Sequence, residues 1–184
     1  GLREPVLPSP DSKSWSSTDL GSVAIGYSVR ETPLHTLTFY NAIANKGRMM
    51  KPYLVESIEK DGVVKTKKGP SVLNASICST ADTLLRALKA VTSEGTAYRL
   101  KGAKLTVAGK TGTARQSLSK EEIEKYGRDP KDNTQTADGS YHNLATFVGF
   151  FPADNPKYSA IICMNSSLIR GSLYGGVGPA SAMR

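Results

Sequence analysis

The chain has 184 residues, 39% of them hydrophobic, which is enough for one core of moderate size. No run approaches the 18 apolar residues of a membrane helix, and the first residues lack the apolar centre of a signal peptide. The net charge of +8 comes from 24 Lys and Arg against 16 Asp and Glu, but these charges are scattered and no row of aromatics accompanies them. Nucleic-acid binding is therefore not expected.

Two cysteines are too few for a disulfide scaffold, and neither cysteine nor histidine has metal-ligand spacing. Cys163 lies in the apolar run SAIICM and is expected to be a small core residue. His35 and His142 are expected to be structural or exposed. No cofactor is expected.

The first half of the chain predicts helices and one hairpin. Residues 1–21 are rich in Pro and Ser and are expected to form an irregular arm. A helix is predicted over residues 33–46, because Thr32 suits an N-cap and Gly47 a C-terminal stop. Two runs of strand-forming residues around Asp61-Gly62 predict a hairpin.

A second helix is predicted over residues 79–93, with Ser79 as its cap and Gly95 at its end. Its leucines recur at helical spacing and are expected to form the buried face together with Val91. The apolar positions are Leu84, Leu85, Leu88 and Val91.

From Leu105 onward the pattern predicts three strands, KLTVAGKTGTARQ, HNLATFVGFFPA and KYSAIICMN. No crossover helix separates the last two, which favours antiparallel neighbours joined by a tight turn at residues 154–156. The predicted class is α+β, an antiparallel β-sheet with packed helices. Residues 117–140 form a polar loop insertion between strands, where Ser119 and Glu122 could cap a short helix. We expect this loop to be mobile and to overhang the groove beside the first strand.

The cluster GKTGT at residues 109–113 admits three interpretations. The simplest is a solvated strand edge. A phosphate-binding loop would need a glycine where Lys104 stands and a helix after the lysine, which Gly112 interrupts.

The third interpretation is one wall of an acyl-transfer site. Alternation along a strand places Thr111 and Thr113 on one face and Lys110 on the other. Two hydroxyls and an ammonium could hold a carboxylate, while Gly112 would let a peptide pair with the strand. The N–H groups of the strand could then stabilise an oxyanion.

Three stretches together resemble the C-terminal half of the transpeptidase domain of class B penicillin-binding proteins, from about Ile25 to Ala180. They are IGYSVRETPLHTLTFYNAIANKGRMMKPYLV, VAGKTGTARQ and ATFVGFFPADNPKYSAIICMN. The segment TFYNAIANKGRMMKP is more similar to the division-type, FtsI-like branch of this family.

The resemblance implies the penicillin-binding/β-lactamase-like transpeptidase fold, here as a partial domain spanning residues 1–184. It also implies a serine-type peptidoglycan D,D-transpeptidase that is acylated by β-lactams. Lys110 would be catalytic, and Thr111, Gly112, Thr113 and Tyr174 would bind substrate. The implied partners are the D-Ala-D-Ala stem peptide, β-lactams and other cell-wall synthesis or division proteins. The implied location is the bacterial cell membrane with this domain on the periplasmic side, attached through an N-terminal segment outside the chain.

The resemblance implies three motifs in chain order: a nucleophilic serine in Ser-x-x-Lys, then Ser-x-Asn, then the Lys-Thr-Gly strand. The first two are missing from the chain. Ser-x-x-Lys occurs at Ser57–Lys60 and Ser117–Lys120, but the first lies in a predicted strand and the second follows the Lys-Thr-Gly strand, against the family's order. Ser-x-Asn is absent. We therefore expect a fragment that begins after the second motif and is inactive by itself. A penicillin-recognising sensor or an inactive cell-wall scaffold remains the alternative.

Overall fold

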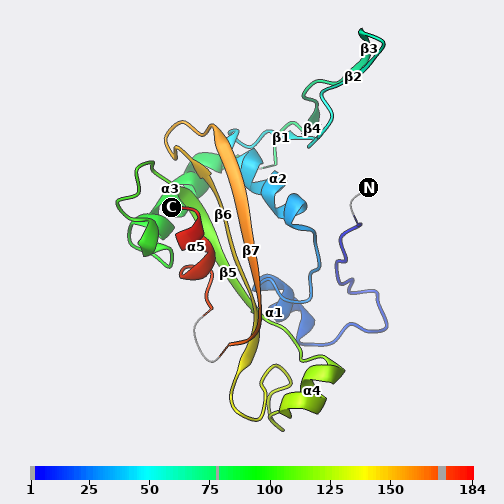
Figure 1. Cartoon of the computed structure of the whole chain (residues 1–184), viewed down its shortest axis with the longest axis vertical. Helices are drawn as coiled ribbons and strands as arrows, with labels where there is room; N and C mark the ends of the chain where they lie inside the picture. The colour runs from blue at the N-terminus through cyan, green and yellow to red at the C-terminus, as the bar shows by residue number, and fades with distance from the viewer. Residues whose placement is uncertain (1–2, 78, 170–172) are drawn as a thin grey trace.

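The computed structural model describes residues 3–77, 79–169 and 173–184, without the side chains of residues 166–169. Helices and strands follow one another along the chain as shown in Figure 1. The elements are α1 (Asp19–Ala24), α2 (Pro33–Ala44), β1 (Met49–Met50), β2 (Ser57–Lys60), β3 (Val63–Lys67), β4 (Val72–Asn74), α3 (Ala81–Ser93), the 3-10 helix η1 (Tyr98–Leu100), β5 (Ala108–Arg115), α4 (Lys120–Tyr126), β6 (Tyr141–Phe151), β7 (Tyr158–Ile169) and α5 (Gly178–Ala182).

The centre of the molecule is a three-stranded sheet in the order β5-β6-β7. Both pairs are antiparallel, with Thr111 opposite Phe147 on β6 and Phe147 opposite Ile162 on β7. The three predicted strands and their antiparallel arrangement are thereby confirmed. The α+β class is confirmed as well, since helices pack on both faces of this sheet.

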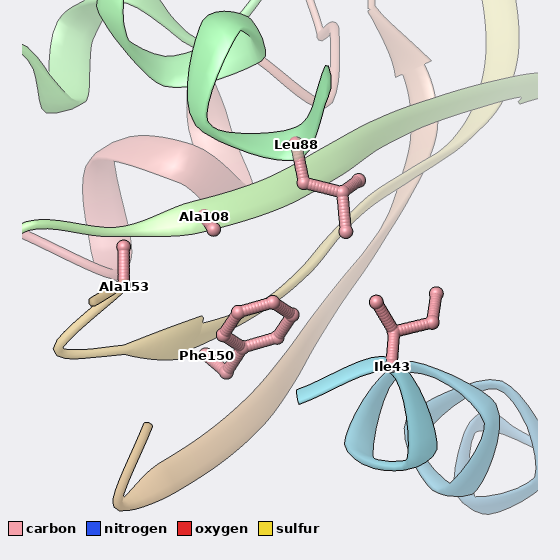
Figure 2. Close-up of a cluster of buried hydrophobic side chains, with 5 residues drawn as sticks. All are labelled: Ile43, Leu88, Ala108, Phe150 and Ala153. Carbon is pink, nitrogen blue, oxygen red and sulfur yellow. The ribbon is translucent and has the colours of Figure 1, made fainter. Parts of the chain in front are cut away.

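The two faces of the sheet carry separate hydrophobic clusters. On one face, α2 and α3 cover the sheet, and Ile43 and Leu88 from these helices meet Ala108 and Phe150 (Figure 2). Phe147 lies three residues before Phe150 on β6, so its side chain points to the other face of the sheet. There it packs with residues from η1 and α5. The second cluster is Ala97, Leu100, Val107, Phe147 and Ala180.

Both long helices form close to their predicted positions. The first ends at Ala44 rather than residue 46, and Gly47 follows with φ +86°, so the predicted glycine stop is present. The second begins at Ala81, with Thr80 in the N-cap position that the sequence assigned to Ser79. Of its predicted apolar face, Leu88 is buried, and Leu84, Leu85 and Val91 pack against the two clusters.

Strands β2 and β3 form the predicted hairpin, which projects away from the body as a narrow arm (Figure 1). Asp61 and Gly62 both have positive φ, 55° and 72°, as a two-residue hairpin turn requires. Every residue of the two strands is exposed. The arm therefore contributes little burial to the core.

One sequence expectation about burial is wrong. Cys163 is exposed, because it pairs with Thr146, about 13 Å along β6 from the Phe150 end that α2 and α3 cover. Most of the polar segment of residues 117–140 is exposed or half-buried, but Leu118 and Thr136 are buried, with 7% and 1% of their surface exposed. This segment does contain the predicted capped helix, α4, in which Ser119 Oγ accepts the N–H of Glu122.

Candidate functional site

Strand β5 lies at one edge of the sheet, and within the described ranges no strand pairs along its outer side. Just past the strand, the N–H of Gln116 donates to the carbonyl of His142 at 2.8 Å. Antiparallel alternation then directs the main-chain groups of Lys110 and Gly112 toward β6, and those of Thr111 and Thr113 outward. The outer edge therefore offers an N–H and a carbonyl at Thr113 in the orientation that an added strand uses.

Two threonine side chains of β5 lie on one face of the strand, as alternation predicts. Thr113 Oγ1 accepts the main-chain N–H of Gly175 at 3.0 Å. Thr111 Oγ1 lies 2.7 Å from Thr96 Oγ1. Because Gly175 contacts Thr113 directly, the adjacent Tyr174 is held next to the same strand, with its side chain half exposed.

The ammonium of Lys110 lies at the outer edge of the strand, although Lys110 starts from the opposite face. Lys110 Nζ donates to the carbonyl of Thr111 at 2.9 Å and lies 3.4 Å from Thr111 Oγ1. A four-carbon side chain is long enough to pass around the strand edge. The side chain of Lys110 leaves the backbone on the face opposite to Thr111, as alternation predicts. Its ammonium group nevertheless lies on the side of the strand that carries the threonine hydroxyls.

A side chain at Gly112 would force the Thr146 hydroxyl to move. A Cβ there would collide with Thr146 Oγ1 on the neighbouring strand. The sequence predicts another reason for glycine here, which is the close approach of a bound peptide to the strand. The contact with Thr146 is a packing reason that favours glycine at this position.

Two further residues lie at this edge and were missed by sequence reasoning. The phenol oxygen of Tyr27 accepts the main-chain N–H of Arg115 at 3.4 Å, beside the far end of the strand. Thr96 reaches Thr111 from the turn after α3. Neither residue stands at a recognisable motif position, and only the fold brings them to β5.

Arg115 itself secures the end of β5. Its guanidinium lies 4.0 Å from the centre of the Tyr141 ring and donates to Asp132 at 3.2 Å. Hydrogen bonds from Thr134, with a smaller contribution from Arg115, hold the pKa of the Asp132 carboxyl below its ordinary value. Arg115 thus ties the segment of residues 117–140 to the strand.

A cavity of about 390 Å³ opens within that segment, between α4 and the turn before β6. Its lining includes Glu121, Lys125, Tyr126 and Asp138. Glu122 also lines it, and its Oε1 lies 3.2 Å from His142 Nδ1. The main-chain N–H of Ser119 is the largest cause that holds the pKa of Glu122 below its ordinary value.

Neither Ser-x-x-Lys string forms a helical serine–lysine pair. Ser57 and Lys60 are the first and last residues of β2 on the exposed arm, and Ser117 precedes α4, which begins at Lys120. The described residues contain no cluster of His, Cys, Asp and Glu that could hold a metal ion. Within the described part of the chain, no helix has the length and apolar character needed to cross a bilayer.

The family model for the penicillin-binding protein transpeptidase domain matches residues 8–176. The chain belongs to this family. The resemblance found in the three sequence stretches is thereby confirmed, and the match covers the chain from α1 to β7, including β5 and the segment around α4.

Curated relatives agree with this assignment. Penicillin-binding protein H of Bacillus subtilis is 33% identical over 153 residues, which are 78% of this chain and 20% of the relative. The FtsI peptidoglycan D,D-transpeptidase of Buchnera aphidicola is 26% identical over 178 residues, which are 96% of this chain and 27% of the relative. The chain thus spans about a fifth to a third of the length of the curated relatives it matches.

Solved structures share the fold. Penicillin-binding protein 3 of Mycobacterium tuberculosis in its apo form has a TM-score of 0.69 at 26% identity, covering 96% of this chain and 38% of that chain. The same protein complexed with ampicillin has a TM-score of 0.66 at 27% identity, covering 89% and 34%. The partial transpeptidase fold predicted from the sequence is confirmed.

Proposed function

We propose that this chain forms the Lys-Thr-Gly wall of a serine-type peptidoglycan D,D-transpeptidase that cross-links stem peptides. The observation that carries the proposal is the outer edge of β5, along which no strand of the described residues pairs, and where the ammonium of Lys110 and the hydroxyl of Thr111 meet. Relatives named peptidoglycan D,D-transpeptidases support the reaction class.

The substrate would bind as an added strand along β5. Its main chain would pair with the outward groups of Thr113, and its terminal carboxylate would accept hydrogen bonds from Thr111 and Thr113 hydroxyls. Lys110 supplies the positive charge beside them. Tyr174, held next to the strand through Gly175, would flank the bound peptide.

The reaction needs a serine that this chain does not supply in a helical Ser-x-x-Lys. We infer that the serine belongs to another segment of the full-length protein. Its oxygen would attack the carbonyl of the penultimate D-Ala, and the terminal D-Ala would leave as its amine takes up a proton. The N–H of Thr113 lies where it could stabilise the oxyanion. An amine of a second stem peptide would then attack the ester, form the cross-link and return the proton to the serine.

The same edge would hold a β-lactam, whose ring carboxylate stands in for the terminal carboxylate of the peptide. Complexes with ampicillin and aztreonam are known for penicillin-binding protein 3 of Mycobacterium tuberculosis. We extend this ligand class to the present chain. Assembly with other cell-wall synthesis or division proteins, and a position on the periplasmic side of the cell membrane, belong to the same proposal.

Intact-mass measurement with ampicillin tests the proposal. The full-length protein should gain one ampicillin mass, on a serine outside residues 1–184, and the chain alone should gain none. An unmodified full-length protein would favour an inactive cell-wall scaffold instead. An adduct on Ser57 or Ser117 would overturn the assignment of the nucleophile.

A further inference from the structure

Thr96 contributes a third hydroxyl to the edge of β5. Its Oγ1 lies 2.7 Å from Thr111 Oγ1, which is a normal distance for a hydrogen bond between hydroxyls. Thr96 is separated from Thr111 by 15 residues and belongs to a different element, the turn between α3 and η1.

The turn that carries Thr96 is fixed on both sides. Gly95 N–H donates to the carbonyl of Ala90 at 2.9 Å, and Ala97 N–H donates to that of Val91 at 3.0 Å, so the turn is bound to the end of α3. Ala97 is fully buried. On the other side, Gly176 lies so close to the carbonyl of Thr96 that a Cβ would collide with it. The backbone of Thr96 is therefore held in place, and the exposed Thr96 hydroxyl extends from it to Thr111.

The consequence for Thr111 follows from its hydrogen-bonding capacity. A hydroxyl has one proton to donate and two lone pairs to accept. Lys110 Nζ, at 3.4 Å, is a donor toward Thr111 Oγ1. If the Thr96 hydroxyl donates as well, both lone pairs are used, and the proton of Thr111 is left to point toward an incoming anion.

We infer that Thr96 is a positioning residue that sets the Thr111 hydroxyl as a donor to the carboxylate of a bound stem peptide or β-lactam. This inference rests on the proposed function. Thr96 acts on the ligand through Thr111, so its effect depends on the negative charge of the ligand and on the presence of the Thr111 hydroxyl.

The test is a set of substitutions in the full-length protein, with ampicillin and its methyl ester as probes. Thr96→Val should lower the second-order rate constant of acylation by ampicillin about five- to tenfold, because the Thr111 hydroxyl is then no longer held as a donor to the charged ligand. The loss should lie in binding more than in the limiting acylation rate. Thr96→Ser, which keeps the hydroxyl, should restore most of the wild-type constant. With the methyl ester, which carries no carboxylate, Thr96→Val should lower the second-order rate constant of acylation less than twofold.

A double-mutant cycle separates positioning from a structural role. Once Thr111→Val is present, adding Thr96→Val should change acylation less than twofold. Thr66→Val on the exposed β2–β3 arm is the matched control and should leave acylation and Tm unchanged. Thr96→Ala is a second removal variant in case Val disturbs the turn.

The outcomes are distinct for the two proposals. Equal losses for ampicillin and its ester, full additivity with Thr111→Val, or wild-type acylation in both removal variants would each overturn the role of Thr96 while leaving the transpeptidase proposal intact. A wild-type protein that forms no adduct with ampicillin would overturn the proposed function and this inference together.

Discussion

The main-chain N–H of Gly175 donates a hydrogen bond of 3.0 Å to Thr113 Oγ1, joining the C-terminal turn to the edge strand. Gly175 is fitted closely there, since a Cβ would collide with the carbonyl of Thr146 and lie 2.6 Å from that of Gly112. Gly175→Ala should therefore push the turn away from β5. We expect a loss of about 1–3 kcal/mol in the free energy of unfolding, as for an overpacked site, measured by urea denaturation.

The control for Gly175→Ala is Gly69→Ala, because no atom lies within 4 Å of a Cβ at Gly69. Its free energy of unfolding should stay within about 0.5 kcal/mol of wild type. Equal stability of the two variants would show that the turn does not depend on the contact at Gly175.

The segment around α4 gives a second prediction. Replacing residues 121–138 with a short Gly-containing turn removes Thr136, whose buried Oγ1 accepts the N–H of Ser140 at 3.1 Å. Since a buried donor left unpaired costs about 1–3 kcal/mol, Tm should fall by several degrees. Shortening the exposed arm of residues 57–67 is the control, and should leave Tm nearly unchanged. An unchanged Tm after the first deletion would show that the segment is dispensable to the core.

The regular elements could be predicted because their signals are local. The helix before Gly47 and the Asp61-Gly62 hairpin depend on caps, turns and periodicity within a few residues. The exposure of Cys163 and the burial of Thr136 could not be predicted, because an apolar run or a polar run does not show which part of a sheet face another element covers. Contacts across the chain decide such positions.

The candidate site was predictable to the same extent. The lysine, the two hydroxyls and their strand follow from the cluster at residues 109–113 and from alternation. The hydroxyl of Thr96 and the phenol of Tyr27 reach β5 from turns 15 and 88 residues away from their partners. No spacing rule relates residues so placed. Likewise, alternation gives the face from which Lys110 starts but not the direction in which its long side chain folds.

A third prediction concerns pH. Because the N–H of Ser119 holds the pKa of Glu122 below its ordinary value, the ionised carboxylate stabilises the start of α4. This contribution is complete above the unfolded pKa, about 4.3, and is lost as the pH falls through the lower folded value. The protection factors of the amides in α4, which correct for the intrinsic exchange rate at each pH, should therefore fall below about pH 4. Glu122→Gln should remove this pH dependence, whereas Glu124→Gln should retain it. Identical pH profiles for wild type and Glu122→Gln would contradict the role of this cap.

The last prediction concerns the two residues that would bind the carboxylate and its counter-charge, in the full-length protein. Thr113→Val removes one hydroxyl without removing the main-chain N–H at the strand edge. It should weaken acylation by ampicillin by about 1–3 kcal/mol, the cost of one charge-assisted hydrogen bond. Lys110→Ala should cost more, because the anion then loses its cation and Thr111 loses a donor at 3.4 Å. Pre-steady-state acylation rates measure both effects, and circular dichroism checks that each variant is folded.

Since Thr113 also accepts the N–H of Gly175, Thr113→Ser is the variant that retains both hydrogen bonds and should acylate at nearly the wild-type rate. Normal acylation of the Thr113→Val variant would contradict a role for Thr113 in binding the carboxylate. Normal acylation of the Lys110→Ala variant would likewise contradict the role of the lysine.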